Sequence, residues 1–210
     1  SPAPEAQPES EPVPPLDQHK FPHERSGAFC GVATLAMAMQ HHGHEVDTGS
    51  REGLEQLARG MYIPGRGTSG DGMARRLERL GHREAEFSSQ GRFSQVVDQL
   101  DRGGVVPMGV TNLTGVVESL PEESERYPHL KAGDRHRHTY GPDGHWVLVI
   151  DYEGEPEAPT AFLVNDPDTG ARLRLTPDQL LKSASANEQG GGIWMIRYGK
   201  TGHGPSPRNP

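Results

Sequence analysis

Cysteine is almost absent from this chain, which has one, Cys30, in 210 residues. A single thiol cannot form a disulfide within the chain, and it excludes a zinc site built mainly from cysteines. No apolar run approaches the roughly 20 residues that cross a bilayer, so we expect no membrane span. Lysine and arginine form no block, and the net charge is -8, which argues against nucleic acid as a partner.

Proline is concentrated where apolar residues are few. Residues 1–22 mix proline with alanine, glutamate and serine, a composition that predicts a disordered linker, and 200–210 predicts a flexible tail. One domain at 23–199 is the expectation for this length. A linker of this kind suits a domain excised from a larger exported chain, so we expect an extracellular or cell-envelope location. The sequence does not indicate an oligomeric state.

Apolar periodicity predicts a helical first half and a strand-rich second half. The expected helices are 30–42, 50–59, 71–80 and 91–100, and the expected strands are 105–110, 145–151, 160–166, 171–175 and 193–198. A capping box at Thr176-Pro177-Asp178-Gln179 predicts a further short helix. Helices followed by an antiparallel sheet give an α+β fold. The long polar stretch 112–143 predicts a loop that borders the functional site.

The candidate reactive residues are Cys30, His145 and Asp166, in that order along the chain. Cys30 opens an apolar helix, where the first-turn N–H groups and the helix dipole favour thiolate over thiol. His145 and Asp166 lie on neighbouring predicted strands, so they can supply a proton acceptor and a group that orients it. Alternative interpretations remain, since a lone cysteine is often a small core residue and Asp166-Pro167 also suits a turn. Asn165 is the alternative orienting residue, expected to point to the opposite face of its strand.

This arrangement resembles the double-glycine (bacteriocin) leader peptidase branch of the papain-like cysteine peptidases. Four segments carry the resemblance: Cys30-Gly31, Gly67-Thr68-Ser69, Gly144 to Ile150 and Asn165 to Gly170. It implies a papain-like fold, with the nucleophile at the start of a central helix and the helical half packed on a C-terminal antiparallel sheet. It also implies Cys30 as nucleophile, His145 as base, Asp166 as the orienting group, and a protein or peptide substrate without a cofactor.

One departure from the family pattern concerns the oxyanion. The family usually has glutamine six residues before the cysteine, and this chain has Glu24 there, preceded by His23. An ionised Glu24 would repel an oxyanion, so the role requires a protonated Glu24, or His23 or Gln18 acting with the Cys30 backbone N–H. We also predict that Trp146, next to His145, contributes to substrate binding.

Histidines are frequent, but their spacing does not predict a metal site. His41 and His42 face different ways on the predicted helix, His44 follows a glycine, and His136 and His138 stand in the polar loop. The glycine-rich stretch 65–72 lacks a preceding strand and a Gly-Lys-Ser/Thr ending, which predicts a loop with a helix cap instead of a phosphate site.

The sequence therefore predicts a thiol hydrolase that cleaves a peptide or isopeptide amide through an acyl-enzyme on Cys30. Acyl transfer to an amine, or deamidation of glutamine, uses the same thioester and stays an alternative. Glu24 at the usual glutamine position motivates a further alternative, a catalytically weak binding module with a peptidase fold.

Overall fold

The structure is a computed structural model that describes residues 12–111, 144–185 and 192–199. The helices are η1 (Gln18–Lys20), η2 (Ser26–Ala28), α1 (Cys30–His41), α2 (Arg51–Ala58), α3 (Gly70–Arg79), α4 (Phe93–Asp101) and α6 (Pro177–Ser185). The strands are β1 (Tyr62–Ile63), β2 (Gly67–Thr68), β3 (Glu86–Gly91), β4 (Val106–Val110), β5 (His145–Glu155), β6 (Ala158–Asp166), β7 (Ala171–Leu175) and β8 (Ile193–Arg197). The predicted α+β class is confirmed.

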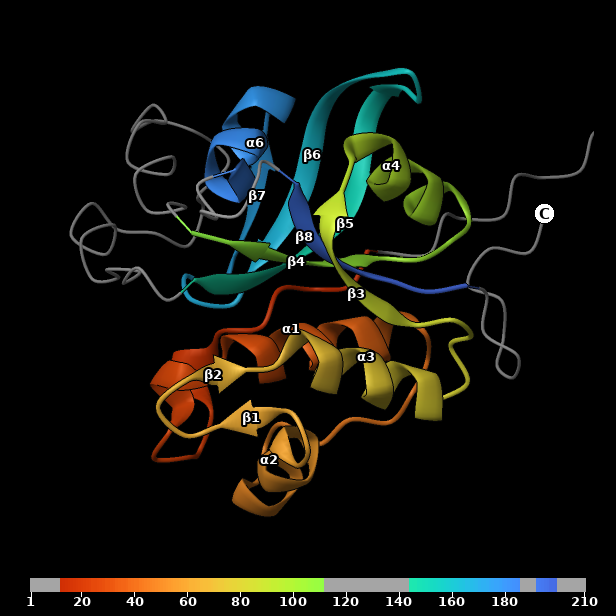
Figure 1. The fold of residues 1–210 in the computed structure, drawn as a ribbon. Coiled ribbons are helices and arrows are strands. Elements are labelled where there is room, and N and C mark those ends of the chain that lie inside the picture. The colour runs from red at the N-terminus through yellow and green to blue at the C-terminus, as the bar shows by residue number, and fades with distance from the viewer. Residues whose placement is uncertain (1–11, 112–143, 186–191, 200–210) are drawn as a thin grey trace, which may run out of the picture.

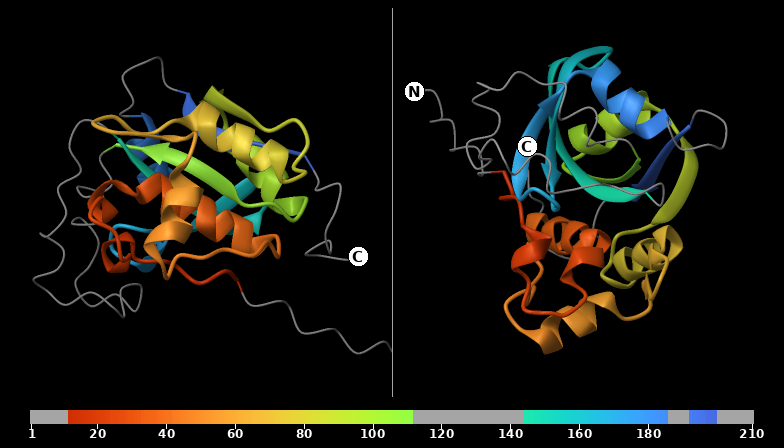
Figure 2. Two further views of the ribbon diagram at one scale, coloured as in Figure 1. Left: turned by 90° about the horizontal axis from the view of Figure 1, so that it is seen from below. Right: turned by 90° about the vertical axis from the view of Figure 1, so that its left-hand side faces the viewer.

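A six-stranded antiparallel sheet forms the centre of the molecule, in the order β3-β8-β4-β5-β6-β7. Helices α1, α2 and α3 and the separate β1–β2 hairpin lie together below the sheet in Figure 1, whereas α4 and α6 lie above it. Figure 2 shows the same division from two further directions. The helical half therefore packs on the sheet, as predicted, and two later helices cover the opposite face.

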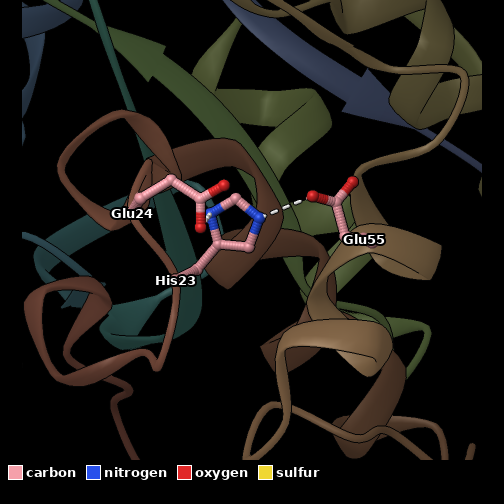
Figure 3. A group of neighbouring side chains, drawn as sticks. All are labelled: His23, Glu24 and Glu55. Atoms are coloured by element: carbon pink, nitrogen blue, oxygen red, sulfur yellow. Dashed lines mark hydrogen bonds and ion pairs between the residues drawn. The ribbon is translucent and has the colours of Figure 1, made fainter.

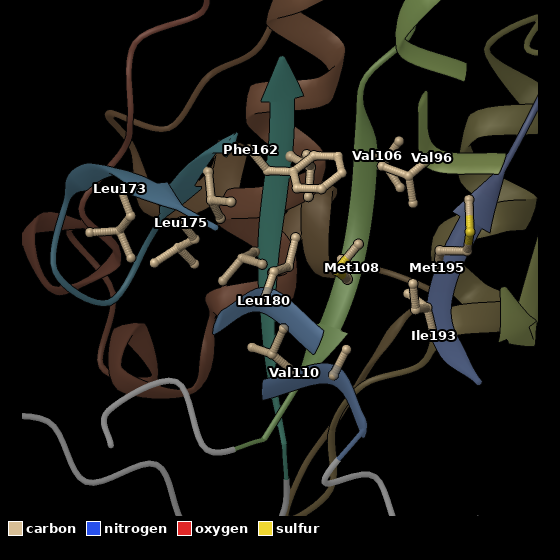
Figure 4. Close-up of a cluster of buried hydrophobic side chains, with 14 of the residues drawn as sticks. Val96, Val106, Met108, Val110, Phe162, Leu173, Leu175, Leu180, Ile193 and Met195 are labelled. Carbon is tan, nitrogen blue, oxygen red and sulfur yellow. The ribbon is translucent and has the colours of Figure 1, made fainter. Parts of the chain in front are cut away.

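Strand β5 contributes apolar side chains to both faces of the sheet. Val147 and Val149 belong to the apolar cluster between the sheet and helices α4 and α6, shown in Figure 4. Leu148 and Ile150 point the other way and pack with Met37 of α1. Because successive side chains alternate between faces, a strand covered on both sides reads as a continuous apolar run.

Most expected elements are present with small changes in their ends. The box at Thr176 is formed as predicted: Thr176 N donates to Gln179 Oε1 (2.9 Å) and Gln179 N to Thr176 Oγ1 (3.2 Å). The helix that it opens extends to Ser185. Ser69 caps α3 through Gly72 N (3.1 Å), so the glycine-rich stretch is a loop with a helix cap. The β1–β2 hairpin and β3 were not predicted.

The predicted boundary at residue 23 is wrong, because the domain begins earlier. Val13 and Phe21 are only 6% and 8% exposed, and Gln18 is buried in η1. Residues 12–22 are therefore part of the folded domain and not of a linker. The rest of the predicted linker, the loop 112–143 and the tail 200–210 lie outside the described residues. Among the helices of the described segments, none has the length and apolar character that a bilayer crossing requires.

Three histidines and a tyrosine meet at the C-terminal end of α1. Nε2 of His82 lies 3.0 Å from Nε2 of His44, and Nε2 of His42 lies 2.7 Å from the Tyr198 hydroxyl. Within the described part of the chain, His82 Nδ1 is buried without a partner, so the proton belongs on its Nε2, which donates to His44. Burial, followed by the neighbouring histidines, lowers the pKa of His42 to about 3 and that of His82 to about 4.

These pKa values predict acid lability. A histidine whose folded pKa is depressed stabilises the fold fully above its ordinary pKa of 6.5, and that contribution is lost as the pH falls toward the folded value. We expect the urea concentration at the unfolding midpoint to be lower at pH 5 than at pH 7. His82→Gln keeps a hydrogen-bonding side chain but does not titrate, so it should reduce the dependence of this midpoint on pH. An equal dependence in both proteins would contradict the assignment.

Candidate active site

Helix α1 presents its N-terminal end at Cys30, the first helical residue. Its N-cap is Phe29, which makes no side-chain cap, whereas Ser50 and Ser69 cap α2 and α3. The first-turn N–H groups of α1 are thus not taken by a capping side chain, and they lie at the positive end of the helix dipole. Cys30 is partly exposed. The thiol at the start of α1 is therefore accessible to reagents.

Gly31 allows the β1–β2 hairpin to lie directly on the start of α1. A Cβ added at Gly31 would stand 2.2 Å from the Cβ and Oγ1 of Thr68. Trp146, next to His145 on β5, also holds β2 in place, because its Nε1 donates to Thr68 O (3.2 Å). Trp146 is 8% exposed, and its bond to Thr68 O supports the hairpin, while its contact with substrate stays a prediction.

The close approach can be tested with a matched pair of alanine variants. Gly31→Ala forces the Thr68 contact apart, and we expect a loss of about 1–3 kcal/mol in the free energy of unfolding. Gly27→Ala is the control, since a Cβ there meets nothing within 4 Å and the glycine has no positive φ. Chemical denaturation of both variants measures the difference. Equal stability would show that the hairpin can move away freely.

His145 and Asp166 form a buried pair across two paired strands. His145 begins β5 and Asp166 ends β6, so antiparallel pairing brings these ends together. His145 Nε2 donates to Asp166 Oδ1 (2.7 Å), and His145 also forms a side-chain hydrogen bond with Cys30. Since Nε2 faces Asp166, Nδ1 is the ring nitrogen left for the thiol. Asp166 also accepts from Asp168 N (3.1 Å) and Thr169 Oγ1 (2.9 Å).

The charges of this pair are stabilised by its hydrogen bonds. Burial alone lowers the pKa of His145, but the bonds with Asp166 and Cys30 outweigh burial and raise it to about 10. Burial alone raises the pKa of Asp166, and the hydrogen bonds from His145, Asp168 N and Thr169 lower it overall. An imidazolium beside a carboxylate at neutral pH is the result, with the imidazolium bonded to Cys30.

Asp166→Asn removes the charge that sustains this imidazolium. We expect the pKa of His145, followed by NMR of the ring, to fall by at least about one unit because burial then dominates. A raised folded pKa stabilises fully below the ordinary 6.5 and less as the pH rises toward 10, so wild-type protein should lose more stability than Asp166→Asn over that range. Asp178→Asn, on the exposed surface of α6, is the charge control. An unchanged His145 pKa in Asp166→Asn would contradict the pairing.

Asn165, the alternative orienting residue, lies on the other side of β6. Its Nδ2 donates to Val13 O (2.9 Å) and its Oδ1 accepts from Arg172 Nε (3.2 Å). Asn165 Nδ2 also lies 3.7 Å from Met37 Sδ on α1. The structure therefore brings Asp166, and not Asn165, to His145.

Glu24 and His23 belong to a charged cluster with Glu55 and Arg51, whose histidine and carboxylates are shown in Figure 3. Arg51 binds both oxygens of Glu24 (2.6 and 3.1 Å), which lowers the pKa of Glu24 to about 2. His23 Nε2 donates to Glu55 Oε1 (2.8 Å), and its Nδ1 accepts from Arg25 N (2.9 Å). Glu24 is ionised and His23 has both ring nitrogens engaged, so the arrangement argues against both residues as the predicted oxyanion donors.

The same cluster is the one place in the described segments where three potential metal ligands approach. One atom from each of His23, Glu24 and Glu55 lies within 4.8 Å of the others. The Arg51 guanidinium already supplies the positive charge there, 2.6 Å from Glu24 and 3.5 Å from Glu55. We interpret the group as an ion-pair network that attaches the loop before Cys30 to α2. His136 and His138 lie outside the described residues.

Gln18, on η1, binds the turn that precedes Cys30. Its Nε2 donates to Gly27 O (2.9 Å) and Ser26 O (3.2 Å), in the turn that leads into Cys30. Its backbone N–H donates to Pro167 O (2.8 Å), next to Asp166. Spacing did not single out Gln18, because it stands 12 residues before Cys30 and not six.

Comparison with known families agrees with this geometry. Residues 10–188 match the Peptidase_C39 like family. The chain belongs to that family. Membership in the Peptidase_C39 like family supports a cysteine peptidase-like hydrolase with a protein substrate, and the matched range includes residues 12–22, which the structure places in the domain. No curated protein matches the chain.

Proposed function

We propose that the protein is a thiol hydrolase that cleaves a peptide or isopeptide amide through an acyl-enzyme on Cys30. His145 acts as acid and base in this proposal, and Asp166 orients it. The single observation that carries the proposal is the hydrogen-bonded series from the start of α1, Cys30 to His145 to Asp166. Three residue types with complementary roles in acyl transfer meet there from three separate elements.

The first half of the reaction forms a thioester. The Cys30 thiolate attacks the carbonyl carbon, and the C=O electron pair moves to oxygen to give a tetrahedral oxyanion. When that intermediate collapses, the C–N bond breaks and the His145 imidazolium gives its proton to the leaving amine. The raised pKa of His145 means that this proton is present at neutral pH.

The oxyanion requires donors close to Cys30. The Cys30 backbone N–H is one, at the uncapped end of α1. For the second we propose Gln18, which would exchange its longer bond, 3.2 Å to Ser26 O, for the oxyanion and keep the bond to Gly27 O. An amide has two N–H donors, so both interactions can be held at once.

The second half of the reaction releases the acyl group. Neutral His145 takes a proton from water and so regains its positive charge, and the resulting hydroxide adds to the thioester carbonyl. Collapse of this intermediate gives the carboxylic acid and expels the Cys30 thiolate. An amine in place of water would give acyl transfer.

Within the Peptidase_C39 like family, assignment to the double-glycine leader peptidase branch stays a prediction, so candidate substrates should include peptides with a Gly-Gly pair.

The proposal is tested first by the pH dependence of thiol alkylation. Cys30 is the only thiol of the chain, so iodoacetamide reports on it alone. We expect rapid alkylation of native protein below pH 7. His145→Ala should react like an ordinary thiol of pKa about 8.5, which is about tenfold or more slower at pH 6. Slow alkylation with the same profile in both proteins would overturn the proposed ion pair.

Turnover is then measured on a proteome-derived peptide library analysed by mass spectrometry. Wild-type protein should produce new peptide termini, whereas Cys30→Ala should produce none. Gln18→Ala should lower turnover by about a hundredfold to a thousandfold while the thiol still alkylates rapidly. Full cleavage by Cys30→Ala would overturn the acyl-enzyme. Reaction in the presence of added amines distinguishes hydrolysis from transfer.

A further inference from the structure

Residues 13–21, which we call the N-terminal strap, run along the end of the sheet that carries Asp166. Val13 O accepts from Asn165 Nδ2 (2.9 Å) and from Arg172 Nη2 (2.7 Å). Further along, Leu16 N donates to Met37 Sδ on α1 (3.3 Å). Buried partners of this kind show that the strap is attached to both layers of the domain.

The second half of the strap binds the turn that follows Asp166. His19 Nε2 donates to Asp168 Oδ1 over 2.6 Å, and this carboxylate is only 9% exposed. An adjacent backbone bond joins Gln18 N to Pro167 O (2.8 Å). Asp168 N in turn donates to Asp166 Oδ1 (3.1 Å). One short turn therefore binds both the strap and the proposed orienting carboxylate.

Helix η1 cannot position Gln18 by itself. It is a 3-10 helix of three residues, and so short a helix has too few internal hydrogen bonds to be stable alone. The hydrogen bonds that hold it include the Asp17 cap on His19 N (2.9 Å), the bonds from Gln18 Nε2 to Gly27 O and Ser26 O, the Pro167 bond and the His19–Asp168 bond. Of these, only the last joins two side chains from distant parts of the chain, and it involves a carboxylate that is largely removed from water.

We propose that His19 and Asp168 are positioning residues that hold Gln18 beside the oxyanion formed at Cys30. The inference rests on the proposed function and extends it to two residues outside the Cys30, His145 and Asp166 set. Losing the anchor leaves Gln18 in the chain but lets η1 shift relative to the Cys30 turn. Displacement of a donor by about 1 Å is sufficient to weaken stabilisation of an oxyanion.

Two reagents separate this role from a general loss of structure. p-Nitrophenyl acetate acylates a thiol through a tetrahedral oxyanion and releases p-nitrophenolate, so its rate depends on the oxyanion donors. Iodoacetamide alkylates the same sulfur by displacing iodide at a saturated carbon, so no oxyanion forms. Both rates require the Cys30 thiolate. A positioning residue for Gln18 therefore affects acylation and spares alkylation.

The variant to make is His19→Ala in the full chain. We expect the acylation rate to fall by about tenfold with unchanged alkylation, and His19→Gln, which restores an N–H donor, to recover part of the loss. Lys20→Ala is the matched control, because it removes a cationic side chain from the same short helix and leaves the Asp168 bond in place. In a Gln18→Ala background, His19→Ala should cause no further loss, since its effect passes through Gln18.

Each other outcome overturns the proposal in a recognisable way. Equal losses in both rates would mean that the pair merely supports the fold. An undiminished loss in the Gln18→Ala background would mean that the pair acts through another group, and no loss at all would mean that it positions nothing. If wild-type Cys30 reacts with both reagents no faster than a free thiol, the proposed function itself fails, and this result is seen before any variant is made.

Discussion

The hydrogen bond between His145 and Asp166 is the constraint around which the rest of the site is arranged. Both side chains are nearly or fully buried, and an ionised group removed from water is tolerated only when its hydrogen bonds are complete. Thr169 and the backbone N–H of Asp168 supply further bonds to the carboxylate, so the turn after β6 must keep one conformation. The N-terminal strap binds that same turn, which links the beginning of the domain to the candidate active site.

Much of the site was predictable because its residues carry local signals. Cys30 opens an apolar helix, and His145 and Asp166 stand at the ends of strands with strong apolar patterns. The capping box at Thr176 also gives a signal over four neighbouring residues, and it formed as predicted. Signals of this kind depend on periodicity and on helix ends, which are properties of a short stretch of chain.

The remaining features depend on contacts between distant segments. The strap contains Pro14 and Pro15 and has little periodicity, yet the carbonyl of Val13 accepts hydrogen bonds from side chains on β6 and β7. The two-residue strands β1 and β2 are too short to show a pattern, and β3, Glu86–Gly91, has a largely polar sequence. Glu24 occupied the expected sequence position for an oxyanion donor, but the position of Arg51 on α2 could not be read from spacing.

The partly exposed thiol of Cys30 has a consequence for redox chemistry. An accessible cysteine can be oxidised to sulfenic acid, which is usually rescued by condensation with a second cysteine. This chain contains no second cysteine, so no resolving disulfide can form within it. Recovery from a first oxidation thus depends on a thiol supplied from outside the chain, and slow reduction would let oxidation proceed to the irreversible sulfinic acid.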